Sequence, residues 1–265
     1  MLPLSHTDRP NVASTLWIIT QLELERLFAS RIGWLYLSAF GFFWYVLLRY
    51  VIFNISSFLS QQNMNGHDWS GTVFSTYFNV GLYVFPLLCI FIAANQTGAD
   101  RERGTLRFIM LRCNRASLFF GRFLSQVLIQ CILIAATLLS TLAVVFYNVG
   151  FSLLALSNAL IMAVNLGLVL LPFIAMMSLL SAVVKSPRQA SLIAGLIWGL
   201  ATAIITGLSH YFPFLEPLKM IVPGMQFDAL TDLEGAAMFS LSYIPILQCA
   251  VLLTAGHYVM KRASL

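Results

Sequence analysis

Long runs of apolar residues alternate with short polar stretches along nearly the whole chain. A helix of about 20 apolar residues is long enough to cross the hydrocarbon layer of a bilayer. By this measure the pattern predicts six membrane spans. We place them at about residues 32–53, 73–94, 118–147, 153–184, 189–212 and 238–260.

The segment 12–31, ahead of the first span, mixes apolar and charged residues with a helical period. Its broad apolar face comprises Leu16, Trp17, Leu24, Leu27 and Phe28. The opposite face carries the charged residues Glu23, Glu25 and Arg26, together with Ile18, Ile19 and Leu22. We therefore predict an amphipathic helix that lies in the membrane interface and is partly covered by protein.

The segment 213–237, ahead of the sixth span, is rich in both proline and large apolar residues. Its prolines, Pro213, Pro217 and Pro223, would break it into short pieces. We expect it to enter the membrane again or to cap the outer mouth of the bundle, since a re-entrant backbone needs surrounding protein or a water-filled cavity. The alternative is an interfacial helix that rests on lipid.

Composition supports an all-α integral membrane protein with a single domain over residues 1–265. The chain is 59% hydrophobic and only 9% charged, whereas soluble domains are about a quarter charged. The four cysteines are isolated, so neither a metal site nor a disulfide framework is expected.

Basic residues gather on one side of the predicted spans, and these account for thirteen of the fifteen Lys and Arg residues. They are Arg9, Arg26, Arg31, Arg101, Arg103, Arg107, Arg112, Arg115, Arg122, Lys185, Arg188, Lys261 and Arg262. Because Lys and Arg accumulate on the cytoplasmic side, we predict that both termini are cytoplasmic and that the protein lies in the inner membrane. Anionic lipids explain the net charge of +5 without a nucleic-acid partner.

The fifth span carries a small residue at every fourth position, which makes a groove along one helix face. These residues are Ser191, Gly195, Gly199, Ala203 and Gly207. The groove could pack within the bundle, across a dimer interface or along a substrate path, and Trp198 could face the space between subunits. The polar residues within the spans are uncharged amides, among them Asn79, Gln130, Asn158 and Gln248, which we expect to tie helices together.

The sequence lacks the residue patterns that nucleotide binding, catalysis and ion-driven transport require. The chain has no P-loop for a nucleotide and no catalytic motif, and no charged residue lies at the middle of a span. We therefore expect no enzymatic activity, and the energy for any transport must come from another chain.

Two motifs and the pattern of spans resemble the permease subunits of ABC-2 type exporters. The first motif, E-L-x-R-L-F-x-S-R-I-x-W, starts at Glu23, and the second, D-R-E-R-G-T-L, starts at Asp100 and is followed by G-R-F-L-S from Gly121. This resemblance covers nearly the full chain. Two positions differ from the usual pattern: Asp100 stands where Glu is common, and the loop has Cys113, Asn114 and Arg115 in place of a proline-containing turn.

The resemblance implies that residues 97–117 form a coupling loop that a separate ATPase contacts. The matching and adjacent residues are Asp100, Arg101, Glu102, Gly104, Thr105, Leu106, Arg107, Ile109 and Met110. The spacing of residues 105–112 is helical, with acidic residues at its start, a bend at Gly104, and Ser117 as the expected cap of the third span. The alternative for the arginines is contact with lipid head groups.

The resemblance further implies two ATPase subunits that bind ATP and Mg, a second permease copy or paralogue, and surrounding lipids. The most direct function is ATP-driven outward movement of a hydrophobic or amphiphilic substrate. A complex that performs mechanical or signalling work on an exterior partner is the alternative, and an intramembrane enzyme or inert scaffold is a third hypothesis.

Overall fold

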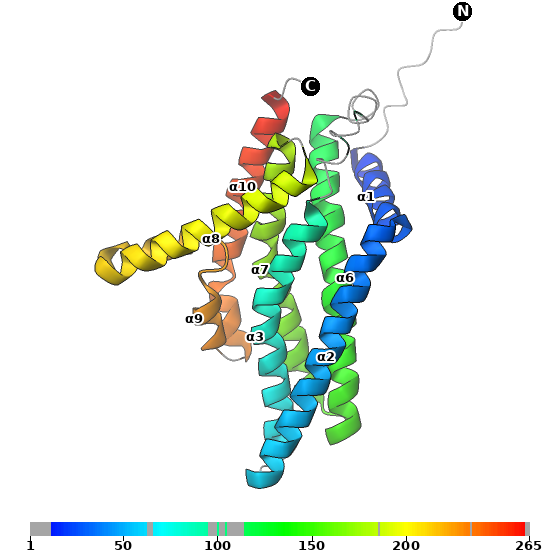
Figure 1. Ribbon diagram of the computed structural model, residues 1–265, viewed down its shortest axis with the longest axis vertical. Helices are drawn as coiled ribbons and strands as arrows, with labels where there is room; N and C mark the ends of the chain where they lie inside the picture. The colour runs from blue at the N-terminus through cyan, green and yellow to red at the C-terminus, as the bar shows by residue number, and fades with distance from the viewer. Residues whose placement is uncertain are drawn as a thin grey trace, which may run out of the picture.

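The computed structural model describes residues 12–62, 66–94, 100, 104, 114–184, 186–233 and 235–262. Within these residues the regular structure is entirely helical. Helices α2 (Arg31–Gln62), α3 (Gly66–Ala93), α6 (Arg115–Val149), α7 (Leu153–Val183) and α10 (Tyr243–Arg262) form an elongated bundle (Figure 1). Helix α1 (Val12–Ala29) lies beside α6, and α8 (Pro187–Tyr211) leans away from the bundle.

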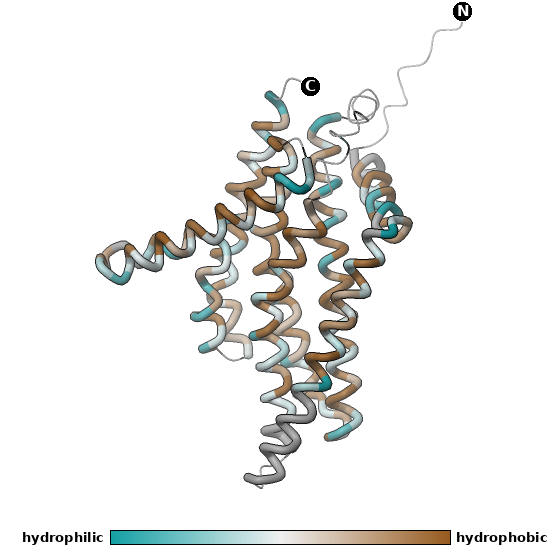
Figure 2. The backbone as a smooth tube through the Cα atoms, in the orientation of Figure 1, coloured by the Kyte–Doolittle hydropathy of each residue, from teal (hydrophilic) through white to brown (hydrophobic). Residues whose placement is uncertain are grey.

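Five stretches in the described part of the chain are long and apolar enough to cross a membrane. They are Ser70–Ala93, Arg115–Val149, Leu153–Val183, Pro187–Tyr211 and Gly235–Arg262. Hydrophobic residues dominate these helices, and hydrophilic residues gather toward the ends of the bundle (Figure 2). The helical membrane class predicted from the sequence is therefore confirmed.

The long helices extend past the apolar runs that predict them. Most of the polar stretch expected between the first two spans is helical, because α2 continues to Gln62 and α3 starts at Gly66. At 1.5 Å per residue, the 32 residues of α2 would span about 48 Å, more than the roughly 30 Å of hydrocarbon. In contrast, α10 starts at Tyr243, later than the predicted sixth span, because the 3-10 helix η2 (Gly235–Leu241) precedes it.

Short polar side chains cap the N-termini of three helices, α6, α7 and α8. Asn114 caps α6, since its side chain accepts a hydrogen bond from the Ala116 amide at 3.3 Å, so the cap expected at Ser117 is wrong. Ser152 and Ser186 cap α7 and α8 in the same way. Gly150 ends α6 with a φ of 89°, a left-handed conformation that favours glycine.

Helix α7 is the centre of the bundle and packs against α3, α6, α8 and α10. Its side chains Leu166, Phe173 and Met177 are fully buried. A helix that is apolar on all sides can face either protein or lipid, and here four neighbouring helices cover much of α7.

The segment between α8 and α10 folds into short helices, η1 (Pro213–Ile221), α9 (Phe227–Thr231) and η2. Two side chains hold its backbone: the Trp198 indole donates to the Pro223 carbonyl at 2.8 Å, and the Gln248 amide donates to the Met220 carbonyl at 2.6 Å. Trp198 also packs edge-on against Phe173. Its indole therefore has partners within its own chain, and whether its half-buried side chain also faces the space between subunits stays a prediction.

Candidate functional site

Two charged residues of α1, Glu23 and Arg26, face the protein, so the inward face of this helix is not simply its predicted apolar face. Ile19 and Thr20 are buried against α6, whereas Trp17 and Phe28 on the predicted apolar face are exposed. Glu23 and Arg26 face inward because Arg122 of α6 and Asp100, which follows α3 in the sequence, pair with them. The exposed apolar side chains remain available to lipid.

Helix α1 approaches α6 most closely at Gly121. A Cβ atom added there would lie 2.9 Å from the Cγ2 atom of Ile19, so only glycine allows this spacing. The Thr20 hydroxyl lies 3.3 Å from the Gly121 carbonyl oxygen and also donates to the Leu16 carbonyl at 2.9 Å. This contact sets the distance between the two helices directly beside Arg122.

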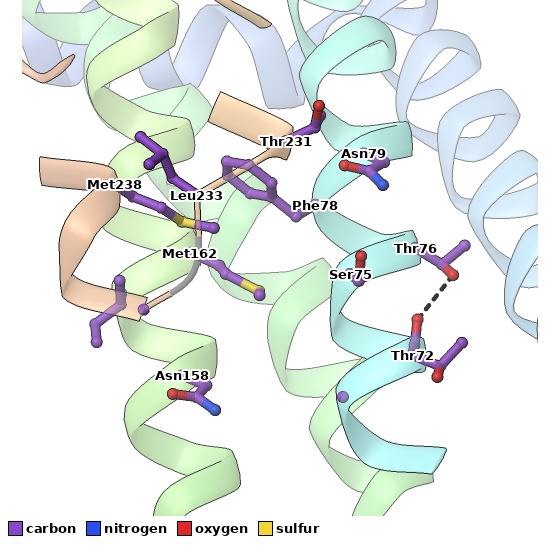
Figure 3. Close-up of a pocket in the computed structure, with 13 residues that line it drawn as sticks. Thr72, Ser75, Thr76, Phe78, Asn79, Asn158, Met162, Thr231, Leu233 and Met238 are labelled. Carbon is purple, nitrogen blue, oxygen red and sulfur yellow. Dashed lines mark hydrogen bonds between the residues drawn. The ribbon is translucent and has the colours of Figure 1, made fainter. Parts of the chain in front are cut away.

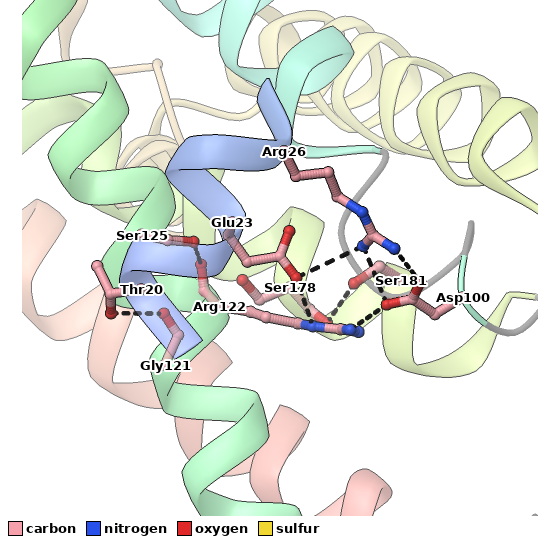
Figure 4. Close-up of polar contacts among 9 residues, drawn as sticks. All are labelled: Thr20, Glu23, Arg26, Asp100, Gly121, Arg122, Ser125, Ser178 and Ser181. Carbon is pink, nitrogen blue, oxygen red and sulfur yellow. Dashed lines mark hydrogen bonds and ion pairs between the residues drawn. The ribbon is translucent and has the colours of Figure 1, made fainter. Parts of the chain in front are cut away.

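Four charged residues meet next to this contact, and we call them the ion-pair network: Glu23 and Arg26 of α1, the helical residue Asp100 from the connection between α3 and α6, and Arg122 of α6 (Figure 4). Arg26 donates to both carboxylate oxygens of Asp100, at 3.1 and 2.5 Å. Arg122 pairs with Asp100 through one terminal nitrogen, and its Nε lies 3.1 Å from Glu23 Oε1.

The network is largely inaccessible to solvent. The side chain of Asp100 is 0% exposed and that of Arg122 is 2% exposed, while Arg26 remains 42% exposed. A buried charge is costly unless it is paired, and these two acidic and two basic groups balance one another. Removing any one member therefore leaves an uncompensated net charge among the other three.

The two carboxyl groups respond to this environment in opposite directions. Burial raises the pKa of Glu23 more than the charges of Arg122 and Arg26 lower it. Burial also acts to raise the pKa of Asp100, but the hydrogen bond from Arg26 and the charges of Arg122 and Arg26 hold it below the ordinary value. The hydrogen bond to Asp100 in turn raises the pKa of Arg26. Asp100 is therefore the firmly ionised acid of the network.

The network joins three segments that are distant in sequence. A displacement of the chain at Asp100 must either carry α1 and α6 along or break ion pairs that are shielded from water. The Ser178 and Ser181 side chains on the last turns of α7 lie nearby (Figure 4). Such a junction is suited to transmitting a movement from the loop to the bundle.

The structure thus brings together Glu23, Arg26 and Asp100, which the sequence assigned to two separate elements. Glu25 is exposed, and Gly104 adopts a φ of 71° in a turn, as its expected bend requires. The other predicted coupling residues lie outside the described residues: Arg101, Glu102, Thr105, Leu106, Arg107, Ile109 and Met110.

The small residues of α8 do not pack within the described part of this chain. A Cβ atom added at Gly195, Gly199 or Gly207 would meet no atom within 4 Å, and Ala203 is exposed. Among the α8 residues, Ala190 and Ala194 are the buried ones, on a different line of the helix from the groove. The groove of α8 therefore faces open space in this chain.

Sequence reasoning counted Arg122 only as one of many basic residues and missed its role in the network. A usable signal was present: Arg122 lies beyond the predicted start of an apolar span, where an arginine needs an acidic partner. The sequence alone could not say which acidic residue provides it, because Glu23 and Asp100 are separated from Arg122 by 99 and 22 positions.

The fold and these contacts define a multi-pass helical membrane protein. The sequence matches the ABC-2 family transporter protein family over residues 17–265. The chain belongs to this family, and is accordingly a membrane component of an ABC transporter that works with an ATPase partner. No curated protein matches it.

Proposed function

We propose that the chain is the permease subunit of an ABC exporter, in which a separate ATPase drives outward movement of a hydrophobic or amphiphilic substrate. Family membership supports a role in transport. The observation that carries the coupling assignment is the ion-pair network, because it fixes the loop residue Asp100 to both α1 and α6.

In this proposal α2 is the first of six spans, and both termini and the ion-pair network lie on the cytoplasmic side of the inner membrane. The distribution of basic residues supports that orientation. The segment 213–237 then lies on the outer side, and its hydrogen bonds to α8 and α10 support a capping role rather than a loose loop.

Coupling would start at residues 97–117, which the ATPase contacts. ATP-driven closure of two ATPase subunits would displace this loop, and Asp100 would pass the displacement to α1 and to α6 through Arg26 and Arg122. ATP and Mg are bound by the ATPase in this scheme, and the permease supplies the passage and the lever.

The test uses the complex with its ATPase in liposomes. Glu102→Arg combined with Gly104→Pro is expected to leave the ATPase bound but to abolish ATP-dependent transport. Arg188→Gln, which removes an exposed arginine at the start of α8, is the control and should retain activity. Unchanged transport by the loop variant would refute the coupling assignment.

Assembly of two permeases along α8 is the second part of the proposal. Gly199→Leu adds a large side chain where this chain leaves open space, so it should leave the single chain folded and weaken self-association at least about tenfold. Ala255→Leu, at an exposed position of α10, is the matched control. Cross-linking in membranes measures the dimer fraction, and unaltered dimerisation of the Gly199 variant would place the interface elsewhere.

A further inference from the structure

A pocket of about 600 Å³ lies between α3, α7 and the segment from α9 to η2 (Figure 3). Its residues belong to the first half of α3 and the first turns of α7. The α3 residue Asn79 precedes the end of that helix at Ala93 by 14 residues, which is about 21 Å along the axis. The pocket is therefore remote from the ion-pair network, in the opposite half of the bundle.

The pocket has a hydrogen-bonding part and an apolar part. The hydrogen-bonding side chains are Thr72, Ser75, Thr76, Asn79, Asn158 and Thr231. The apolar side chains are Phe78, Ile161, Met162, Leu233 and Met238. None of the described lining residues is charged, and the exposed Asp232 next to Thr231 is not among them.

Three of the polar groups have no partner in the described part of the chain. Ser75, Asn79 and Asn158 make no hydrogen bond there, although they face the pocket from two helices (Figure 3). Other hydroxyls of the bundle, such as those of Thr141 and Ser157, donate to a carbonyl of their own helix. The amides at 79 and 158 therefore do not tie helices together as expected, and their hydrogen-bonding capacity is available to a ligand.

We propose that this pocket binds a neutral, hydroxyl-rich group such as the sugar head of a glycolipid. Hydroxyl and amide side chains both donate and accept, which matches the mixed donors and acceptors of sugar hydroxyls. Cationic side chains make the strongest hydrogen bonds to a phosphate head group, and the described lining offers none, so it favours a neutral head group. The apolar wall suits the attached hydrocarbon, and the volume falls within the roughly 300–1,000 Å³ typical of ligand sites.

This inference rests on the proposed function in one respect: the proposed orientation decides on which side of the membrane the pocket opens. It names a ligand class for the permease and can be tested on the full chain in nanodiscs without ATPase or nucleotide. A failure of binding is therefore distinguishable from a failure of ATP coupling.

The experiment measures lipid retention by native mass spectrometry. Nanodiscs of phosphatidylcholine are doped with glucosyl-diacylglycerol, with diacylglycerol of the same chains, or with phosphatidylglycerol. We expect the glucosyl lipid to be retained at least about tenfold better than the other two, since each well-made hydrogen bond contributes severalfold to affinity. Equal retention of the three lipids would overturn the proposal.

Variants place the binding at this pocket. Asn79→Leu with Asn158→Leu should reduce glucosyl-lipid retention about tenfold, whereas Asn148→Leu should not, because Asn148 is an exposed amide on α6 outside the pocket. Ser75→Ala, a smaller change, should reduce glucosyl-lipid retention severalfold. This variant tests binding at the pocket if the double variant does not fold. Retention equal to wild type in the folded variants would overturn the assignment.

A competition arm identifies the source of the sugar group. Free maltose that displaces the glucosyl lipid from the wild type would show that the pocket accepts a soluble sugar. Retention of the glucosyl lipid despite excess maltose would show that the pocket requires a lipid-linked head group.

Discussion

Arg122 is the residue on which the ion-pair network depends, because it is 2% exposed and pairs with acids from two different segments. A buried arginine is costly unless acidic partners stay beside it, so Glu23 and Asp100 must remain in place. The neighbouring Gly121 allows α1 to come close enough to supply one of them.

Replacing Arg122 with Met should lower the free energy of unfolding by about 3–5 kcal/mol, since Asp100 and Glu23 lose a buried partner. Arg188→Met should change it by less than about 0.5 kcal/mol, because Arg188 is exposed. Denaturant unfolding in detergent measures both. Equal effects of the two substitutions would mean that the network does not stabilise the fold.

The pH dependence of stability should separate Glu23 from Asp100. The raised pKa of Glu23 means that its contribution to stability is present below the ordinary glutamate pKa and is lost as pH rises through the folded value. The lowered pKa of Asp100 means that its contribution is present above the ordinary aspartate pKa and is lost as pH falls toward the folded value. Wild type should therefore gain stability relative to Glu23→Gln as pH falls from neutral to mildly acidic.

Denaturant midpoints of wild type and Glu23→Gln across this range measure the difference. A difference that stays constant with pH would show that Glu23 does not titrate in this window. Glu25→Gln is the control, because Glu25 is an exposed acid on the same helix and should leave the pH profile of wild type unchanged.

At the scale of elements, the position of α1 depends on its contact with α6 rather than on its apolar face. Glu23 and Arg26 of α1 are directed inward together with Ile19, whereas Trp17, Leu22 and Phe28 are exposed. A helix held in this way is attached to the bundle at a defined point and can move with it.

Gly121→Ala should destabilise the protein by about 1–3 kcal/mol, because its Cβ would collide with Ile19 and force α1 away. Gly167→Ala, on α7, is the matched control, since a Cβ there meets no atom within 4 Å. The control should be neutral or more stable by up to about 1 kcal/mol, from helix propensity. Thermal unfolding compares the two, and a neutral Gly121 variant would mean that the close approach is not needed.

At the scale of the whole molecule, two sets of contacts hold together parts of the chain that are distant in sequence. The ion-pair network joins α1, Asp100 and α6, and a separate pair of hydrogen bonds, from Trp198 of α8 and Gln248 of α10, holds the segment from η1 to η2. A change in the angle of α8 would therefore act on this segment through the Trp198 hydrogen bond.

Trp198→Phe keeps the ring but removes the donor to the Pro223 carbonyl. We expect residues 220–227 to exchange their amide hydrogens about three- to tenfold faster, which corresponds to losing about 0.5–1.5 kcal/mol. Trp17→Phe, at an exposed position of α1, should have no effect on this segment. Exchange rates equal to wild type would show that the hydrogen bond does not restrain the segment.

The sequence by itself determined the class of protein and most of its helices. Apolar runs long enough to cross a bilayer leave few alternatives to helices, because backbone groups in hydrocarbon must be paired within the chain. The residue pattern from Glu23 and Asp100 was sufficient to indicate the family that the comparison confirms.

Only the tertiary structure decided which charged residues meet and which faces are covered. Glu23, Asp100 and Arg122 are remote in sequence, and their pairing depends on how α1 crosses α6 at Gly121. Likewise, the residue spacing predicts a groove on α8, but only the structure shows that this groove is left open. The sequence shows Asn79 and Asn158 within two predicted spans, but only the structure places them in one pocket. The local residue pattern determines which secondary structure a segment can form. The packing of distant segments determines which side chains find hydrogen-bond or ion-pair partners.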